Sequence, residues 1–169
     1  MDDIEAIRRV QAQYGRAADT KDWELLRPTV TDGFHCDTGA GGRGETNGID
    51  AFIARVGTNP AVTVHHALLP EIELTSPTTA TGIWAVHLFA KTPDGTAVDA
   101  YGHYHNAYEK HDGAWRLSSL CLEWLHREIR PGTTKRNERM ASPAVRCSLG
   151  CQSNAATGSR DACRNDRPR

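Results

Sequence analysis

Two adjacent histidines, His65 and His66, interrupt an otherwise apolar stretch, TVHHALL at residues 63–69. The stretch lies in a segment with the length and composition of a buried β-strand, and neighbouring strand residues point to opposite faces of a sheet. One of the two side chains must therefore face a core or a cavity, and the other must face solvent or a partner. An imidazole that faces a cavity is either a packing residue or a candidate general base. Strand geometry alone leaves open which histidine points inward.

A carboxylate and a phenol lie upstream of these histidines. Asp19 closes the first predicted helix, and Tyr14 lies about one turn earlier. Asp19 has two interpretations: it caps the following helix, since D-T-K-D-W is a plausible capping sequence, or its carboxylate faces a cavity and orients a histidine. On these residues alone, capping is the favoured interpretation.

Metal binding has weak support among the eight histidines and five cysteines. His103 and His105 would share one face of a strand, but no carboxylate or cysteine occupies an obvious completing position. Three of the cysteines follow C-x3-C-x11-C near the C-terminal end, which matches no usual zinc spacing. We therefore expect no metal site, and free thiols in a reducing compartment.

The elements that must position these residues form an α+β pattern. Helical spacing of apolar residues predicts a helix ending near Asp19, with TKDWELLRPTV and IDAFIARV as two shorter helices and the glycine-rich DTGAGGRGETNG as a loop. Four strands follow, at residues 62–74, 79–91, 97–110 and 114–127, joined by the turn sequences SPT, PDG and HDG. This order predicts three N-terminal helices packed on one face of a curved antiparallel sheet.

Alternation within two of these strands predicts which side chains face the helices. In the strand at 97–110, the odd-numbered set carries His103 and His105, so we assign the even-numbered set, with Tyr104, to the concave face. In the strand at 79–91 both sets are fairly apolar.

The whole chain has 169 residues, of which 24% are charged, enough for one domain with its own core. It has no apolar run of membrane-spanning length, and MDDIEAIRRV is unlike a signal sequence, so we expect a cytoplasmic protein that does not bind membranes.

Residues 1–129 hold eleven Lys/Arg and eighteen Asp/Glu, whereas residues 130–169 hold nine Lys/Arg and three Asp/Glu. The acidic body argues against nucleic-acid binding. We predict a folded domain over 1–129 and a disordered basic tail over 130–169.

Three stretches within residues 1–129 resemble the SnoaL-like branch of the NTF2-like superfamily, whose fold is a cone-shaped α+β barrel. IEAIRRVQAQYGRAADTKDWELL has the family's Tyr-x4-Asp spacing, TVHHALLPEIELTSPTTATGIWAV has its H-x4-P-x-I pattern, and GHYHNAYEKHDGAWRL resembles its hairpin. Scytalone dehydratase, hexachlorocyclohexane dehydrochlorinase and bile-acid 7α-dehydratase types of this family are lyases without a cofactor. They use an Asp–His pair at the bottom of the cone.

The resemblance implies a set of site residues in this chain. The catalytic pair falls on Asp19 and His65, through a shared T-x-H pattern, and a cavity tyrosine falls on Tyr14. No cofactor and no metal is implied. With the aromatic residues of neighbouring strands added, the expected substrate-binding residues are Tyr104, Trp84, Val86, Leu88 and Trp124.

The chain also departs from the family pattern at two positions. Leu120 falls where the dehydrochlorinase carries an arginine, and Ala90 falls where the scytalone enzyme carries its second histidine. Stabilisation of the leaving group must therefore differ, and no substrate is inherited from these relatives.

The resemblance implies proton-transfer chemistry on a small, mostly apolar cyclic or polyketide-like molecule, with dehydratase-type elimination favoured. Isomerisation or ring closure by the same pair is an alternative, and so is a non-catalytic ligand-binding domain, because one fold hosts many functions. The family also implies a homo-oligomer, a dimer or trimer. His66, His87, His103 and His105 would then lie in an interface or in solvent.

Overall fold

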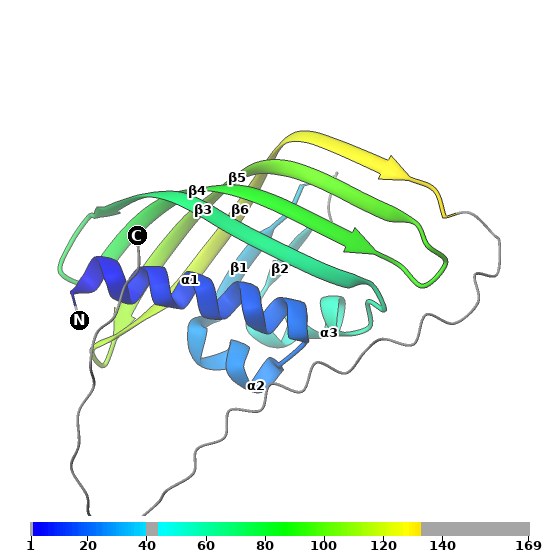
Figure 1. Ribbon diagram of the computed structural model, residues 1–169. Coiled ribbons are helices and arrows are strands. Elements are labelled where there is room, and N and C mark those ends of the chain that lie inside the picture. The colour runs from blue at the N-terminus through cyan, green and yellow to red at the C-terminus, as the bar shows by residue number, and fades with distance from the viewer. Residues whose placement is uncertain (1, 40–43, 133–169) are drawn as a thin grey trace, which may run out of the picture. The chain divides into compact units, whose positions relative to one another are not determined.

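The computed structural model describes residues 2–39 and 44–132, which form one α+β unit (Figure 1). The predicted disordered tail lies outside the described residues from position 133 onward. Among the described residues, no helix has both the length and the apolar character needed to cross a membrane. The elements are α1 (Asp3–Thr20), α2 (Trp23–Leu26), a 3-10 turn η1 (Arg27–Thr29), β1 (Val30–Asp37), β2 (Glu45–Asn47), α3 (Ile49–Gly57), β3 (Val62–Leu74), β4 (Thr79–Lys91), β5 (Ala97–His111) and β6 (Ala114–Arg130).

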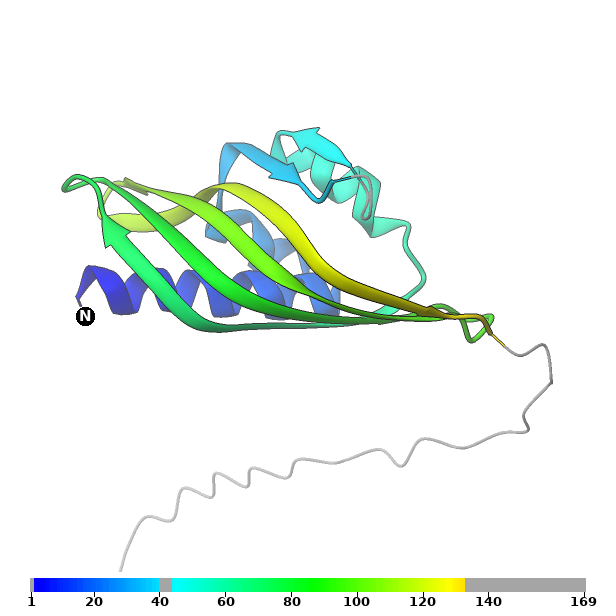
Figure 2. The same cartoon turned by 90° about the horizontal axis from the view of Figure 1, so that it is seen from above.

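The strands form a single curved sheet in the order β2-β1-β6-β5-β4-β3. β3 to β6 are antiparallel neighbours in chain order, as the turn sequences predict, whereas β1 pairs with β6 in parallel. Figure 2 shows this order from β3 at the lower edge to β1 and β2 at the upper edge, with α3 beside β2. The sheet is therefore mixed and open, and its two edge strands are β2 and β3.

Helix α1 packs on the concave face of the sheet, most extensively against β3 (Figure 1). Asp2 caps its N-terminus by accepting a hydrogen bond from the Glu5 amide at 2.8 Å, and Lys21 ends it in the left-handed conformation. The buried side chains recur at helical spacing and form one stripe that faces the sheet. They are Ile7, Val10, Gln11, Tyr14 and Ala17.

The inward face of the sheet agrees with the predicted alternation. Trp84, Val86 and Tyr104 are buried, whereas the odd-numbered His105 is exposed. Register shifts interrupt the pairing of β5 with β6 after Tyr101 and after Ala107, and such bulges bend a sheet. A further shift between Leu68 and Glu71 interrupts the pairing of β3 with β4.

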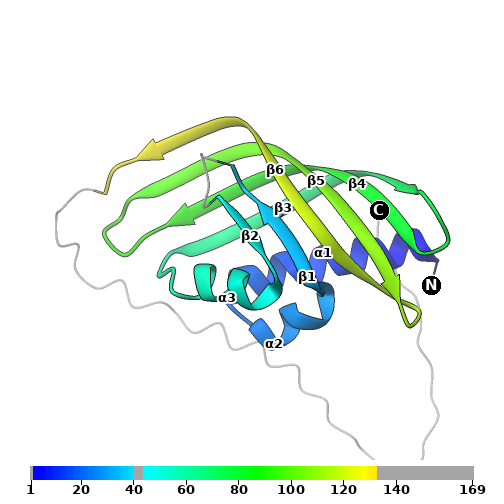
Figure 3. The ribbon, with the colours of Figure 1, turned by 180° about the vertical axis from the view of Figure 1, so that it is seen from behind.

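Strands β1 and β2 were not predicted, so the expectation of four purely antiparallel strands is wrong in this part (Figure 3). Only Val30, Phe34 and Cys36 of β1 are buried, and a register shift separates Val30 from His35. The apolar alternation is therefore broken. β2 lies in the predicted glycine-rich loop and pairs with β1 through three residues, ETN, which carry no apolar signal.

The sheet's curvature generates a first prediction, at Gly102. A Cβ at this position would lie 2.0 Å from the carbonyl oxygen of Glu123, next to the register shift in β5. Because the obstacle is backbone, Gly102→Ala should lower the free energy of unfolding by about 3 kcal/mol. Urea denaturation measures this change.

The matched control is Gly33→Ala in β1, where a Cβ would meet no atom within 4 Å. It should change stability by less than about 0.5 kcal/mol. Equal stability of the two variants would contradict the assignment of Gly102 to a close backbone approach.

Candidate active site

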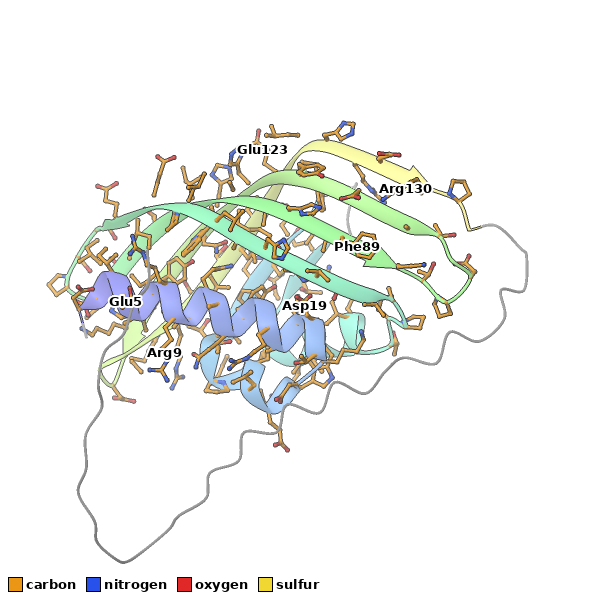
Figure 4. The ribbon with its side chains drawn as sticks, viewed as in Figure 1. Glu5, Arg9, Asp19, Phe89, Glu123 and Arg130 are labelled. Carbon is orange, nitrogen blue, oxygen red and sulfur yellow. The ribbon has the colours of Figure 1, made fainter. Side chains whose placement is uncertain are left out.

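Asp19 and His65 contact each other where the last turn of α1 meets β3. His65 Nδ1 lies 2.5 Å from Asp19 Oδ1, and the His65 backbone N–H donates to Oδ2 at 2.9 Å. The Thr63 hydroxyl donates to Oδ1 at 3.0 Å. Figure 4 shows Asp19 beneath β3 at the end of α1. The carboxylate therefore holds the histidine ring by a contact to its side chain and a second contact to its backbone.

These contacts fix the charge of Asp19. Partial burial acts to raise the pKa of Asp19, but hydrogen bonds from the ring and backbone of His65 outweigh it, helped by Thr63, and the net pKa lies below its ordinary value. Asp19 is therefore ionised at neutral pH, and its carboxylate accepts a hydrogen bond from the protonated Nδ1 of His65. In the neutral ring the lone pair is then on Nε2, which is the nitrogen open to a substrate.

His65 lines a cavity of about 440 Å³ inside the cone. The cavity is bounded by residues of α1, β1, α3 and the concave face of the sheet, most of them apolar. The predicted residues Tyr14, Tyr104, Leu88 and Trp124 all line it. The indole N–H of Trp124 donates to the Thr38 carbonyl at 2.9 Å, which fixes the orientation of the ring.

Two other predicted substrate-binding residues, Trp84 and Val86, do not line this cavity. Both are buried, and the Trp84 indole N–H donates to the Tyr108 hydroxyl at 2.9 Å. Their side chains are on the expected face of β4, but Val86 packs within the core and Trp84 borders a second cavity between α1 and β3. Strand alternation gives the face and not the depth, so it cannot separate a cavity wall from the core behind it.

Three tyrosines, one from α1 and two from β5, are buried inside the protein, and their hydroxyls differ in their hydrogen-bond partners. The Tyr108 hydroxyl donates to Gln11 and accepts from Trp84 and Asn106. Within the described part of the chain, the hydroxyls of Tyr14 and Tyr104 have no hydrogen-bond partner. Burial raises the pKa of both, so each is a protonated donor facing the cavity.

Several cavity residues had no signal in the sequence. Cys36, Phe52 and Arg55 come from β1 and α3, whose positions depend on tertiary packing. Burial raises the pKa of the Cys36 thiol to about 11, so it is a neutral wall residue at pH 7. Thr63 was detectable, because it lies two residues before His65 and two residues is the repeat of one strand face.

The remaining histidines lie outside the cavity. His66 is exposed, and His87 bonds to Asp99 at 2.7 Å while stacking on Tyr101 at 4.7 Å. Residues 2–39 and 44–132 contain no group of three or more His, Cys, Asp or Glu side chains arranged to hold a metal ion. His65 is thus the histidine that combines a carboxylate partner with a cavity.

Comparison with known proteins agrees with this fold. The family model described as SnoaL-like domain matches residues 1–120. A crystal structure of a hexachlorocyclohexane dehydrochlorinase, LinA type 2, superposes with a TM-score of 0.69 at 19% identity, covering 83% of this chain and 94% of that one.

Two further structures are similar. A protein from Novosphingobium aromaticivorans proposed to be a scytalone dehydratase has a TM-score of 0.66 at 20% identity, over 80% of this chain and 95% of that one. The Kfla4162 protein of Kribbella flavida has a TM-score of 0.67 at 23% identity, over 75% and 93%. At these identities the structures show a shared fold.

The lowered pKa of Asp19 generates a prediction for stability. A group whose pKa is lower in the folded state stabilises the fold above its ordinary pKa, 3.8 here, and loses that contribution as pH falls through the folded value. Asp19→Asn should therefore lower the melting temperature at about pH 7, and the difference from wild type should shrink at about pH 3. Differential scanning calorimetry at both pH values measures it.

The control is Asp32→Asn, which removes an exposed carboxylate from β1. This variant should track wild type at both pH values. A melting-temperature difference for Asp19→Asn that stays constant from neutral to acid pH would contradict the ionised Asp19–His65 contact.

Proposed function

This chain belongs to the SnoaL-like family of the NTF2-like superfamily, and we propose that it is a cofactor-independent lyase that catalyses a dehydratase-type elimination. Its substrate is a small, mostly apolar cyclic or polyketide-like molecule. The observation that carries the proposal is the Asp19–His65 contact on the wall of the cone cavity.

In this proposal His65 is the general base. Nε2 takes a proton from a substrate carbon, the C–H electrons form a new C=C bond, and the group on the adjacent carbon leaves with its bonding electrons. Asp19 stabilises the imidazolium that forms and keeps the ring in one tautomer. A positioned base of this kind contributes about 10²–10⁴ in rate.

This chain has Leu120 where the dehydrochlorinase carries an arginine, and Ala90 where the scytalone enzyme carries its second histidine. Another group must therefore donate a hydrogen bond to the leaving group. Tyr14 and Tyr104 supply candidates, since each offers a protonated hydroxyl without a protein partner among the described residues. A hydrogen bond from either one to a departing hydroxide oxygen lowers the barrier where charge develops. The proton carried by His65 then completes the loss of water.

The cavity wall supports the substrate class. Leu88, Phe52 and Trp124 offer flat apolar surfaces, and about 440 Å³ suits a molecule of one to three rings. Two of the similar structures carry names of elimination enzymes, a dehydrochlorinase and a proposed dehydratase, which favours elimination over other proton transfers.

The same pair supports isomerisation or ring closure when the proton comes from a carbon next to a carbonyl. Product analysis separates these reactions, because elimination releases a small molecule whereas isomerisation conserves the substrate's mass. A non-catalytic binding domain is the third alternative, and it predicts no turnover at all.

We also propose that the protein is a cytoplasmic homo-oligomer that packs through the outer face of its sheet. Rings from four adjacent strands form a row across this face: His66, His87, Tyr101 and His126. Light scattering of the full chain reports its mass, and a monomer at micromolar concentration would contradict this.

The catalytic proposal is tested with His65→Gln and a panel of cyclic β-hydroxy ketones, scytalone and γ-hexachlorocyclohexane. Absorbance reports the new conjugated double bond, and mass spectrometry reports the lost group. For a compound that wild type converts, His65→Gln should lower kcat about 10²–10⁴-fold. The base is absent in this variant, while the hydrogen-bonding amide preserves contacts to Asp19.

The matched control is His111→Gln, the same change at an exposed histidine at the end of β5 that lines neither cavity of the protein. It should keep kcat within about twofold of wild type. Unchanged turnover by His65→Gln, or equal losses in both variants, would overturn the assignment of His65 as the base.

A further inference from the structure

A second cavity, of about 460 Å³, lies between α1 and the edge strand β3. Its helix side is formed by Gln11, Ala12 and Gly15, and its strand side by Val64, Ala67 and Leu68. Most of its surface is apolar. This volume is large enough to hold part of a ligand.

The two cavities meet at the candidate base. Tyr14, His65 and Tyr104 line both, and Asp19 also lines the second. The Asp19–His65 pair therefore lies between the cone and the gap beside β3.

The helix side of the second cavity carries two arginines beside the Asp19 carboxylate, which is already held by His65. Arg8 and Arg16 line it two helical turns apart, on either side of Ala12. The Arg8 side chain is 52% exposed, and its contact with Glu5 is long, at 3.8 Å. Arg16 is exposed as well, so both guanidinium groups are available to an anion at the mouth of an apolar space.

The inner end of this cavity is polar. Gln11 is only 3% exposed, and its Oε1 accepts hydrogen bonds from Asn106 at 2.8 Å and Tyr108 at 2.9 Å. Because the oxygen is occupied, the NH₂ group is the part of Gln11 left to donate to a ligand.

Gly15 keeps the gap open. Glycine is unfavourable within a helix, and here it is not required by a clash, since a Cβ would lie 3.8 Å from the carbonyl oxygen of His65 in ordinary contact. Its effect is to leave space between α1 and β3 beside the base.

From these observations we propose that the gap between α1 and β3 is a second subsite, which binds an extended apolar arm ending in a carboxylate held by Arg8 and Arg16. The ring of the same molecule occupies the cone, with the reacting carbon at His65. The substrate class is then an amphipathic carboxylate, a cyclic body with an acidic side chain. This inference rests on the proposed lyase function for the ring and on the second cavity for the arm.

Calorimetric titration of the full chain with dodecanoate, below its micelle concentration and at low salt, tests the subsite without turnover. Arg8→Ala/Arg16→Ala should weaken dodecanoate binding at least tenfold and change the binding of neutral dodecan-1-ol less than twofold. Ala12→Trp, which fills the gap from the exposed side of the helix, should weaken both ligands at least tenfold. Circular dichroism checks that each variant keeps the wild-type fold.

The matched control is Arg9→Ala, which removes the same charge one residue along α1, on the side of the helix away from the sheet (Figure 4). It should leave the affinity for dodecanoate within twofold of wild type. Equal weakening by Arg9→Ala would overturn the subsite, as would unchanged dodecanoate affinity in the double arginine variant or in Ala12→Trp.

His65→Gln separates this inference from the proposed function. It should lose turnover, and in this background Arg8→Ala/Arg16→Ala should still weaken dodecanoate binding at least tenfold. If turnover depends on His65 but dodecanoate affinity is unchanged when the two arginines are replaced, the subsite proposal is wrong and the lyase proposal stands. If binding depends on the arginines but no compound is turned over, the subsite stands and the lyase proposal fails.

Discussion

The contact on which the site depends is the carboxylate of Asp19 at the junction of a helix and an edge strand. Its two oxygens accept from the His65 ring, the His65 backbone and the Thr63 hydroxyl. A partly buried charge is costly unless several donors satisfy it, and here three donors do so. Because two come from one residue, the position of the His65 ring and the position of β3 relative to α1 are set together. Chemistry and packing share one constraint.

The other buried polar side chains fall into two sets, one bonded within the protein and one facing the cavity. Gln11, Asn106, Tyr108 and Trp84 form one hydrogen-bond network beneath the helix. Tyr14 and Tyr104 are equally buried, but their hydroxyls face the cavity and have no hydrogen-bond partner among the described residues. Buried polar groups without a partner are costly in a core, so their location beside His65 indicates a surface shaped for a ligand.

Much of this fold was predictable from the sequence, because its largest part is local. Strands β3 to β6 follow one another through short turns, and alternation with turn residues located their ends within a few positions. β1 was not predictable, since it pairs in parallel with β6, more than eighty residues away along the chain, and its own pattern is interrupted by polar residues. At the site, the contact of Asp19 with His65 followed from the family resemblance, while capping was the better interpretation of the residues alone. Cys36, Phe52 and Arg55 were missed because tertiary packing, and not local sequence, sets where β1 and α3 lie against the cavity.

The edge position of β3 gives the Asp19 contact one more consequence, for behaviour in concentrated solution. A thirteen-residue edge strand with exposed leucines is a template on which a second molecule can add a strand and begin aggregation. Asp19 occupies the His65 amide of that edge, and the shift between Leu68 and Glu71 breaks the strand's regularity further along. The side chain that orients the candidate base thus also protects the protein against edge-to-edge polymerisation. Selection for solubility and selection for catalysis would act on the same carboxylate.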